Sequence, residues 1–307
     1  MKITIVGAGH VGATTAKLIA DKTLCDKLVL LDILEGVPQG KVLDILQSCP
    51  IEYSDIKIVG TNDYDLTVNS DIIVIAAGVA RRPGITRDDL LDTNAEIVKS
   101  CTELVTKKSQ KAIIIVVSNP LDVMTYVAYE ISGFPKHRVM GMAGSLDAAR
   151  FKTFVANELN VSVEDITCLV IGGHGDYMVP LSKYSTVSGI PLTELISKDK
   201  FDKIIERTKN AGVEIVNNLK TGTSCYAPAS GVVQLVEAIV KDRKRIISCS
   251  TYLDGEFGLD DVCCGVPVKL GRNGIEEIIR MKLNDEEYTA FKNSAEKVKS
   301  NIAKLNI

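Results

Sequence analysis

The first 140 or so residues alternate short, β-branched apolar runs with stretches of helical periodicity. The runs lie at residues 3–6, 28–31, 56–59, 72–76 and 112–117, with a shorter one at 138–140. Between the first two, apolar side chains repeat at helical spacing, at Val11, Ala16, Leu18 and Ile19. This alternation predicts parallel strands joined by right-handed helical crossovers, which is a doubly wound α/β sheet of the Rossmann type.

The rhythm changes after about residue 144. Helical periodicity at 145–159, 200–219, 227–240 and 285–304 is interspersed with strand-like segments at 167–171, 178–185, 246–253 and 262–270. This mixed order is typical of an α+β domain. Because no low-complexity linker separates the halves, we expect two domains, residues 1–143 and 144–307, that share a broad interface.

Composition narrows the class of protein. With 46% hydrophobic and 24% charged residues, the chain has the balance of an ordered globular protein. Its longest apolar run, residues 72–80, is far shorter than the roughly 20 residues of a membrane-spanning helix, and the apolar start breaks at once into a glycine-rich segment, unlike a secretory signal. We therefore expect a cytoplasmic protein that does not engage a membrane.

Charge and cysteine content exclude further classes. A formal net charge of −3 provides no basic field to attract nucleic acid. The eight cysteines form no Cys-x-x-Cys pair near a histidine, so we expect reduced, buried thiols and no metal site.

A glycine-rich segment, Gly7-Ala8-Gly9-His10-Val11-Gly12, follows the first predicted strand and opens a helix. In that context Gly7 permits a tight turn, Gly9 lets a pyrophosphate approach the backbone, and Gly12 lets the helix pack on the strand. Asp32 ends the second strand, twenty residues beyond Gly12, where an acid can accept hydrogen bonds from an adenosine ribose and would repel a 2′-phosphate. The pattern predicts binding of NAD in preference to NADP.

Two further segments lie at the carboxyl ends of predicted strands, where ligands bind in such sheets. Residues 78–87 form a Gly- and Pro-containing loop with arginines at Arg81, Arg82 and Arg87, and residues 118–120 read Ser-Asn-Pro. The arginine loop is either a lid that binds an anion or an ordinary solvated loop, because most exposed arginines have no special task.

The second half contributes a possible acid–base group. Asp147 and Arg150 lie three residues apart on one face of a predicted helix, which by itself is equally typical of a surface ion pair. His174 ends an apolar strand inside the glycine-rich segment at 171–176. Histidine titrates near neutrality and suits proton transfer, and neither His10 nor His137 has a comparable setting.

Together these segments resemble the lactate/malate dehydrogenase family, and within it the malate dehydrogenases that share the lactate dehydrogenase architecture. The resemblance covers essentially the whole chain. Its most specific motifs lie at residues 7–12, 80–87, 117–122, 146–150 and 172–176.

The resemblance implies a role for each matching residue. His174 is expected to accept the proton of the substrate hydroxyl, and Asp147 to orient its imidazole. Arg150 is expected to hold the substrate carboxylate in a fork of two hydrogen bonds. Arg87 would polarise the carbonyl oxygen when the lid closes, and Asn119 would hydrogen-bond near nicotinamide and substrate.

Other matched positions concern specificity and the cofactor. Arg81 stands where malate dehydrogenases have arginine and lactate dehydrogenases commonly have glutamine, and Ser224 matches a position that lines the pocket. Arg82 is more often lysine in relatives, a change that we expect to matter little. The positions expected to contact NAD are Gly7, Gly9, His10, Val11, Gly12, Asp32, Asn94, Val117 and Asn119.

The resemblance predicts a malate dehydrogenase that interconverts malate and oxaloacetate with NAD and works as a homodimer or homotetramer. A lactate dehydrogenase is the main alternative. An enzyme that acts on another 2-oxo dicarboxylate is a further alternative, because Arg81 alone does not determine the length of the substrate. A nucleotide-binding sensor without catalysis would have no use for Asp147, Arg150 and His174 together.

Overall fold

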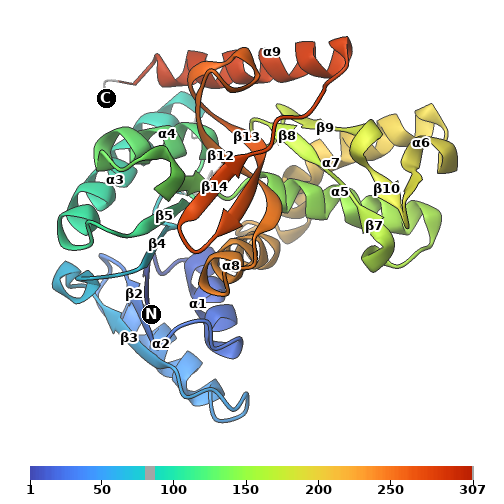
Figure 1. Ribbon diagram of the computed structural model, residues 1–307. Helices are drawn as coiled ribbons and strands as arrows, with labels where there is room; N and C mark the ends of the chain where they lie inside the picture. Colours follow the sequence, from blue (N-terminus) through green and yellow to red (C-terminus); the bar gives the residue numbers. More distant parts are fainter. Residues whose placement is uncertain (80–86, 306–307) are drawn as a thin grey trace.

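The computed structural model describes residues 1–79 and 87–305, except for the side chains of residues 87–89. Its first half contains parallel strands in the spatial order β3-β2-β1-β4-β5-β6, with helices between them (Figure 1). The strands are β1 (Lys2–Val6), β2 (Lys27–Leu31), β3 (Lys57–Thr61), β4 (Ile72–Ile75), β5 (Ile113–Val116) and β6 (Val139–Gly141), and the helices are α1 (His10–Asp21), α2 (Val37–Ser48), α3 (Arg87–Lys108) and α4 (Leu121–Ser132). The predicted doubly wound sheet is confirmed, and its strand order reverses between β1 and β4.

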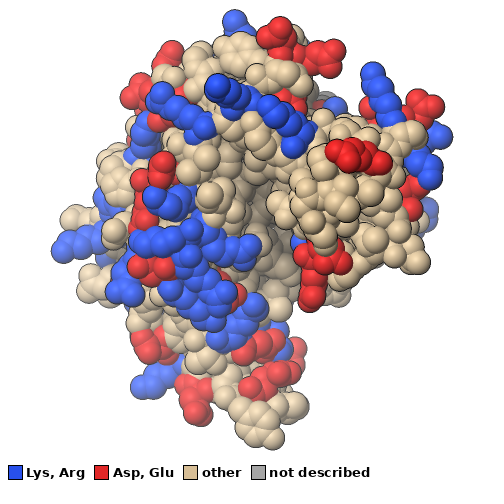
Figure 2. All heavy atoms as spheres, turned by 45° about the vertical axis from the view of Figure 1, so that its right-hand side comes forward, with Lys and Arg blue, Asp and Glu red and all other residues tan. Residues whose placement is uncertain are grey.

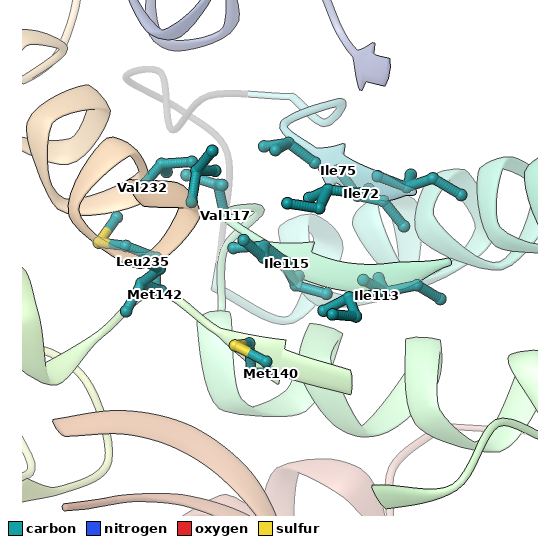
Figure 3. Packing of buried hydrophobic residues seen from close by; sticks show 14 of the residues in the cluster. Ile72, Ile75, Ile113, Ile115, Val117, Met140, Met142, Val232 and Leu235 are labelled. Carbon is teal, nitrogen blue, oxygen red and sulfur yellow. The ribbon is translucent and has the colours of Figure 1, made fainter. Parts of the chain in front are cut away.

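The central strands are buried on both faces. Every residue of β4 and β5 is buried, as expected for strands of a parallel sheet covered by helices on each side. Figure 3 shows this packing around Ile72, Ile75, Ile113 and Ile115, with helix α8 (Tyr226–Val240) of the second half beside the carboxyl end of β5. One core therefore includes residues from both halves.

The sheet does not stop at β6. Strand β12 (Arg245–Asp254) pairs antiparallel with β6 through Ser250 and Gly141, and the order continues through β13, β8 and β9. The remaining strands are β7 (Ile166–Thr167), β8 (Val170–Gly172), β9 (Met178–Pro180), β10 (Thr186–Val187), β11 (Ile190–Pro191), β13 (Asp260–Gly271) and β14 (Gly274–Ile278), and the remaining helices are α5 (Gly144–Leu159), α6 (Leu192–Leu195), α7 (Lys198–Leu219) and α9 (Asp285–Ile302). The two halves are thus joined by a continuous sheet.

The connections include short 3-10 turns, at η1 (Tyr64–Thr67), η2 (Lys136–Arg138), η3 (Val163–Asp165), η4 (Ser182–Tyr184) and η5 (Glu256–Gly258). Among the described residues, none of the helices is both long and apolar enough to cross a membrane.

Two expectations for the second half were wrong in detail, and one strand was missed. The strand expected at 167–171 is two strands, because β7 joins a small sheet with β10 and β11 while β8 joins the large one. The strand expected at 178–185 ends at Pro180 and gives way to η4. Strand β14 was not anticipated: its pairing with β13 depends on the turn at Gly274, whose φ of 90° suits glycine.

An ion-pair cluster links α1 of the first half to α8 of the second. Glu237 in α8 pairs with Lys22, which follows α1, and with Lys241 and Arg243. Hydrogen bonds from Lys22 and Lys241 lower the pKa of Glu237 to about 2.

Figure 2 shows that basic side chains gather on one face of the molecule, with acidic ones among and beside them.

Candidate active site

The glycine-rich turn between β1 and α1 has open space in front of it. Gly7 has a φ of 103°, and a Cβ on Gly12 would lie 1.8 Å from the carbonyl oxygen of Gly7, so both positions require glycine. A Cβ on Gly9 would meet no atom within 4 Å. Helix α1 begins at His10, which is exposed, and Val11 is half-buried. An open backbone at the positive end of a helix fits the pyrophosphate of a dinucleotide.

Asp32, directly after β2, is fixed against this turn. Its Oδ2 accepts a 2.6 Å hydrogen bond from the backbone N–H of Ala8, and its Oδ1 accepts one of 3.0 Å from Leu34. Lys41 also binds the turn, by donating to the carbonyl oxygen of Ala8. A carboxylate oxygen has room for two hydrogen bonds and each oxygen of Asp32 accepts one here, so the half-buried Asp32 retains capacity for a ribose hydroxyl.

Asn94 holds together the loops that follow β4 and β5. Its Nδ2 donates to the carbonyl oxygens of Asn119, at 2.7 Å, and of Val79, at 3.2 Å, and its Oδ1 accepts from the N–H of Val79 at 2.7 Å. Both N–H groups of this amide are therefore used by neighbouring backbone.

Val117 is buried at the end of β5, whereas Asn119 is exposed, so Asn119 is accessible to a ligand. The expected cofactor contacts of these residues stay predictions.

His174, Asp147 and Arg150 come together between β8 and α5. His174 follows β8, and its Nδ1 lies 2.9 Å from Oδ2 of Asp147, which sits in the first turn of α5. Nη1 of Arg150 lies 3.6 Å from Oδ1 of the same carboxylate. The side chains are 16%, 3% and 12% exposed for His174, Asp147 and Arg150, which rules out a surface ion pair.

This arrangement sets the charge of the histidine. Burial by itself lowers the pKa of His174, but the negative charge and hydrogen bond of Asp147 outweigh burial, so the pKa lies above its usual 6.5. Arg150 opposes this rise and Asp122 adds to it. Because the carboxylate engages Nδ1, the nitrogen left for proton exchange with another molecule is Nε2.

Arg150 is a nearly buried cation with an unused donor. Among the described residues, its Nε has no hydrogen-bond partner, and the contact of Nη1 with Asp147 is too long for a strong hydrogen bond. Burial lowers the pKa of Arg150, although a guanidinium stays charged under ordinary conditions. A nearly buried guanidinium with an unpaired Nε–H and a weakly engaged Nη1 fits a carboxylate ligand.

Two buried side chains that sequence reasoning did not select bind the backbone of the histidine loop. The N–H of His174 donates to Oδ2 of Asp122 at 2.7 Å, and the N–H of Gly173 donates to Oγ of Ser294 at 2.8 Å. Asp122 lies in α4 and Ser294 in α9. Asp122 belongs to the motif at 117–122, but nothing local in the sequence indicates that it meets residues about fifty positions away.

Some expected site residues are not placed. Arg81 and Arg82 lie outside the described residues, and the side chain of Arg87, at the start of α3, is also not described. Ser224 is half-buried just before α8. In the described ranges, there is no group of three His, Cys, Asp or Glu side chains that could hold a metal ion.

Comparison with known proteins gives consistent matches over the whole chain. Residues 1–141 match the family model of the lactate/malate dehydrogenase NAD-binding domain, and residues 144–306 match that of the α/β C-terminal domain. A malate dehydrogenase of Chlorobium limicola is 57% identical over 305 residues, which cover 99% of this chain and 98% of the relative.

Solved structures agree with these matches. A malate dehydrogenase from Salinibacter ruber is 51% identical, with a TM-score of 0.95 over 99% of this chain and 97% of that one. A lactate dehydrogenase from Cryptosporidium parvum, solved with lactic acid and nicotinamide adenine dinucleotide, has the same TM-score but is 39% identical, over 98% of this chain and 96% of that one. The fold alone therefore does not separate the two activities, whereas sequence identity is higher for the malate dehydrogenase.

Proposed function

The chain belongs to the lactate/malate dehydrogenase family, and we infer that it catalyses the NAD-dependent oxidation of (S)-malate to oxaloacetate and the reverse reduction. The observation that carries this function is the buried pair of His174 and Asp147 beside Arg150, whose Nε is unpaired among the described residues. The pair supplies a base, and the guanidinium supplies a site for a carboxylate. The names of the relatives favour malate over lactate.

NAD is the cofactor, in accordance with the NAD-binding family model. Gly7, Gly9 and Gly12 would form the turn that faces its pyrophosphate, and Asp32 would accept hydrogen bonds from the adenosine ribose. Bound NAD supplies the nicotinamide ring that accepts the hydride from C2 of malate.

In malate oxidation, Nε2 of His174 accepts the proton of the C2 hydroxyl. Asp147 accepts the hydrogen bond from Nδ1–H, which keeps Nε2 unprotonated in the neutral imidazole and stabilises the imidazolium once the proton has moved. In oxaloacetate reduction the protonated His174 returns that proton to the carbonyl oxygen. Because the pair is nearly buried, water competes poorly for these hydrogen bonds.

The remaining residues bind substrate. Arg150 would hold the C1 carboxylate by a pair of charge-assisted hydrogen bonds. Arg87 would polarise the C2 carbonyl, Asn119 would hydrogen-bond near nicotinamide and substrate, and Arg81 would pair with the second carboxylate that malate has and lactate lacks. These roles follow from the family resemblance of the motifs.

Activity with a panel of 2-oxo acids, measured with NADH and with NADPH, tests the function. Pyruvate offers a methyl group where oxaloacetate offers a carboxylate, so pyruvate would leave the charge of Arg81 without a partner. An unpaired buried charge costs at least about 2 kcal/mol. At about 1.4 kcal/mol per tenfold change, kcat/KM should favour oxaloacetate at least about thirty-fold. Arg81→Gln should narrow that ratio. Preference for pyruvate in the wild type would make the chain a lactate dehydrogenase, and no turnover of any 2-oxo acid would favour a sensor.

Cofactor choice provides a separate prediction. Asp32→Ser is expected to weaken the use of NADH and improve the use of NADPH, because the acceptor for the ribose hydroxyls and the repulsion of a 2′-phosphate disappear together. The measurement is kcat/KM for both cofactors at saturating oxaloacetate. Asp63→Ser is a matched control, since Asp63 follows β3 and accepts a hydrogen bond from the N–H of Asp65. An unchanged preference in Asp32→Ser would remove Asp32 from the ribose site.

The raised pKa of His174 predicts opposite pH profiles for the two directions. Reduction requires the protonated imidazole, so its kcat/KM should fall as pH rises through the pKa of His174, which lies above 6.5. Oxidation requires the neutral imidazole, so its kcat/KM should rise over the same interval. The opposite slopes follow because one group must be protonated in one direction and neutral in the other. Profiles that both rise or both fall through this interval would contradict the assignment of the proton transfer to His174.

We also propose that the chain works in the cytoplasm as a homodimer or homotetramer of two-domain subunits, with the boundary near residue 143. Exposed apolar side chains on α2 and α7 support association: Leu43 and Leu46 on the first helix, and Val213, Val216 and Leu219 on the second. Light scattering coupled to gel filtration distinguishes monomer, dimer and tetramer.

A further inference from the structure

The histidine loop is held by a second buried carboxylate in addition to Asp147. We propose that Asp122 is a positioning residue whose hydrogen bond fixes the backbone of His174 and whose negative charge favours the protonated imidazole during oxaloacetate reduction. This inference rests on the proposed function, because it concerns the same proton transfer. None of the roles assigned above to the motif at 117–122 includes this carboxylate.

Asp122 lies in the first turn of α4 and is only 4% exposed. Its Oδ2 accepts the 2.7 Å hydrogen bond from the N–H of His174, and its Oδ1 accepts a 2.7 Å hydrogen bond from the hydroxyl of Ser250 on β12. The carboxylate therefore joins three elements: a helix, a strand of the continuous sheet and the loop after β8.

The bonding partners favour the ionised form of Asp122. A backbone N–H is always a donor, and the Ser250 hydroxyl donates as well, so the ionised carboxylate receives one hydrogen bond on each oxygen. Burial has the largest effect and holds the pKa of Asp122 above its usual value, with a further rise from Asp147, whereas these two bonds and the nearby His174 oppose that rise. Burial also raises the pKa of Cys263 and Cys264 on β13 well above the usual value, so these thiols add no charge beside it.

The charges around His174 have opposed effects on its pKa. From α5, Asp147 favours the imidazolium through direct contact and Arg150 disfavours it. From α4, Asp122 adds a second negative charge on the backbone side of the residue. Binding of a substrate carboxylate would offset Arg150, which leaves two carboxylates to stabilise the proton on His174 until it is transferred.

Asp122 also links the two parts of the site. Helix α4 begins two residues after Asn119, on the loop expected to meet nicotinamide and substrate. The bond from Asp122 to the N–H of His174 therefore sets the distance between that loop and the base. If this bond were lost, the loop at Asn119 and the base His174 could move apart, and the two would no longer meet the same substrate.

The test compares Asp122→Asn with Ser294→Ala. An asparagine has the shape of the aspartate: its Oδ1 can accept from the His174 N–H while its Nδ2 donates to the Ser250 hydroxyl, so the variant removes charge but keeps the bonds. Ser294→Ala removes the hydrogen bond to Gly173 in the same loop without changing charge, and is the matched control.

The main readout is the pKa of His174, followed by NMR of the imidazole in the protein without substrate. The chain has three histidines, so His10 and His137 serve as internal references. In Asp122→Asn the pKa of His174 should fall by about half a unit to one unit, as expected for loss of a nearby opposite charge. The falling limb of kcat/KM for oxaloacetate reduction should move to lower pH by the same amount. In Ser294→Ala both midpoints should stay at their wild-type values.

An unchanged pKa of His174 in Asp122→Asn, or an equal shift in Ser294→Ala, would overturn the proposal and leave Asp122 a structural anchor. If Asp122→Asn does not fold, carbon NMR of the wild-type carboxyl decides: an ionised Asp122 between about pH 6 and 8 supports the proposal, and a protonated one overturns it. The NMR titration needs no turnover. A lowered pKa in an enzyme that does not use malate would therefore reject the proposed function and keep only the effect of Asp122 on the pKa of His174.

Discussion

Replacement of His174 by asparagine is expected to reduce kcat at least about 10²–10⁴-fold, the usual contribution of a positioned acid or base, while NADH binds nearly as in the wild type. Asparagine retains a polar amide close in size to part of the imidazole but does not exchange a proton near neutral pH. The nucleotide turn around Gly9 and Asp32 belongs to other elements, so cofactor affinity should be preserved.

The measurement has two parts, steady-state turnover of oxaloacetate and titration with NADH. The chain has no tryptophan, so the fluorescence of NADH reports binding without interference from indole. His137→Asn is the matched control, because His137 lies in η2 and makes none of the contacts that pair His174 with Asp147. Near-wild-type turnover by His174→Asn would exclude this residue as the proton acceptor.

Asp147→Asn should impair the same step by a different route. The amide can present its own N–H to Nδ1, which places the imidazole proton on Nε2 and blocks that nitrogen as a base. We therefore expect a fall in kcat together with a lower pKa of His174, because the charge that raises it is removed. A rise in KM alone, with kcat and the pKa of His174 unchanged, would contradict the orienting role of Asp147.

The sequence was sufficient for the parallel sheet because its strands are continuous apolar runs. Strands β4 and β5 consist of isoleucine and valine alone, and such runs identify themselves without any tertiary information. Strand β14 has two glutamates among its five residues, and its position depends on pairing with β13 across a tight turn. Pairing of this kind is decided by the neighbouring strand, and so the local pattern did not indicate it.

The residues of the candidate site also fall into two groups, those that the sequence indicated and those that only the structure revealed. His174 was singled out by its glycine-rich segment, whereas Asp147 and Arg150 were assigned to the site only through the resemblance of their motif to the family, and the structure brings the three side chains together. Asp122 and Ser294 act on the same loop from α4 and α9, at separations of 52 and 121 residues. A buried aspartate and serine inside helices have no local signal for such contacts, since the contacts arise only when the elements pack.

Arg150→Gln is expected to lower kcat/KM for oxaloacetate by about 30-fold to several thousand-fold. The Arg150 side chain is 12% exposed and its Nε has no partner among the described residues, so a substrate carboxylate would be its main ligand. Loss of one member of a buried charge pair costs about 2–5 kcal/mol, which corresponds to that range at about 1.4 kcal/mol per tenfold change. Arg150→Lys keeps the charge but not the planar fork, and should recover only part of the loss.

The loss in Arg150→Gln should be dominated by KM, with NADH affinity close to wild type, because the residue is expected to bind substrate and not the cofactor. Arg207→Gln is the control, since that arginine pairs with Glu214 on the exposed surface of α7, where an ion pair contributes little. The decisive comparison is between oxaloacetate and a substrate analogue without the C1 carboxylate. If Arg150 binds that group, the wild type should discriminate strongly between the two and Arg150→Gln weakly. Equal discrimination by both enzymes would mean that Arg150 supports Asp147 instead of the substrate.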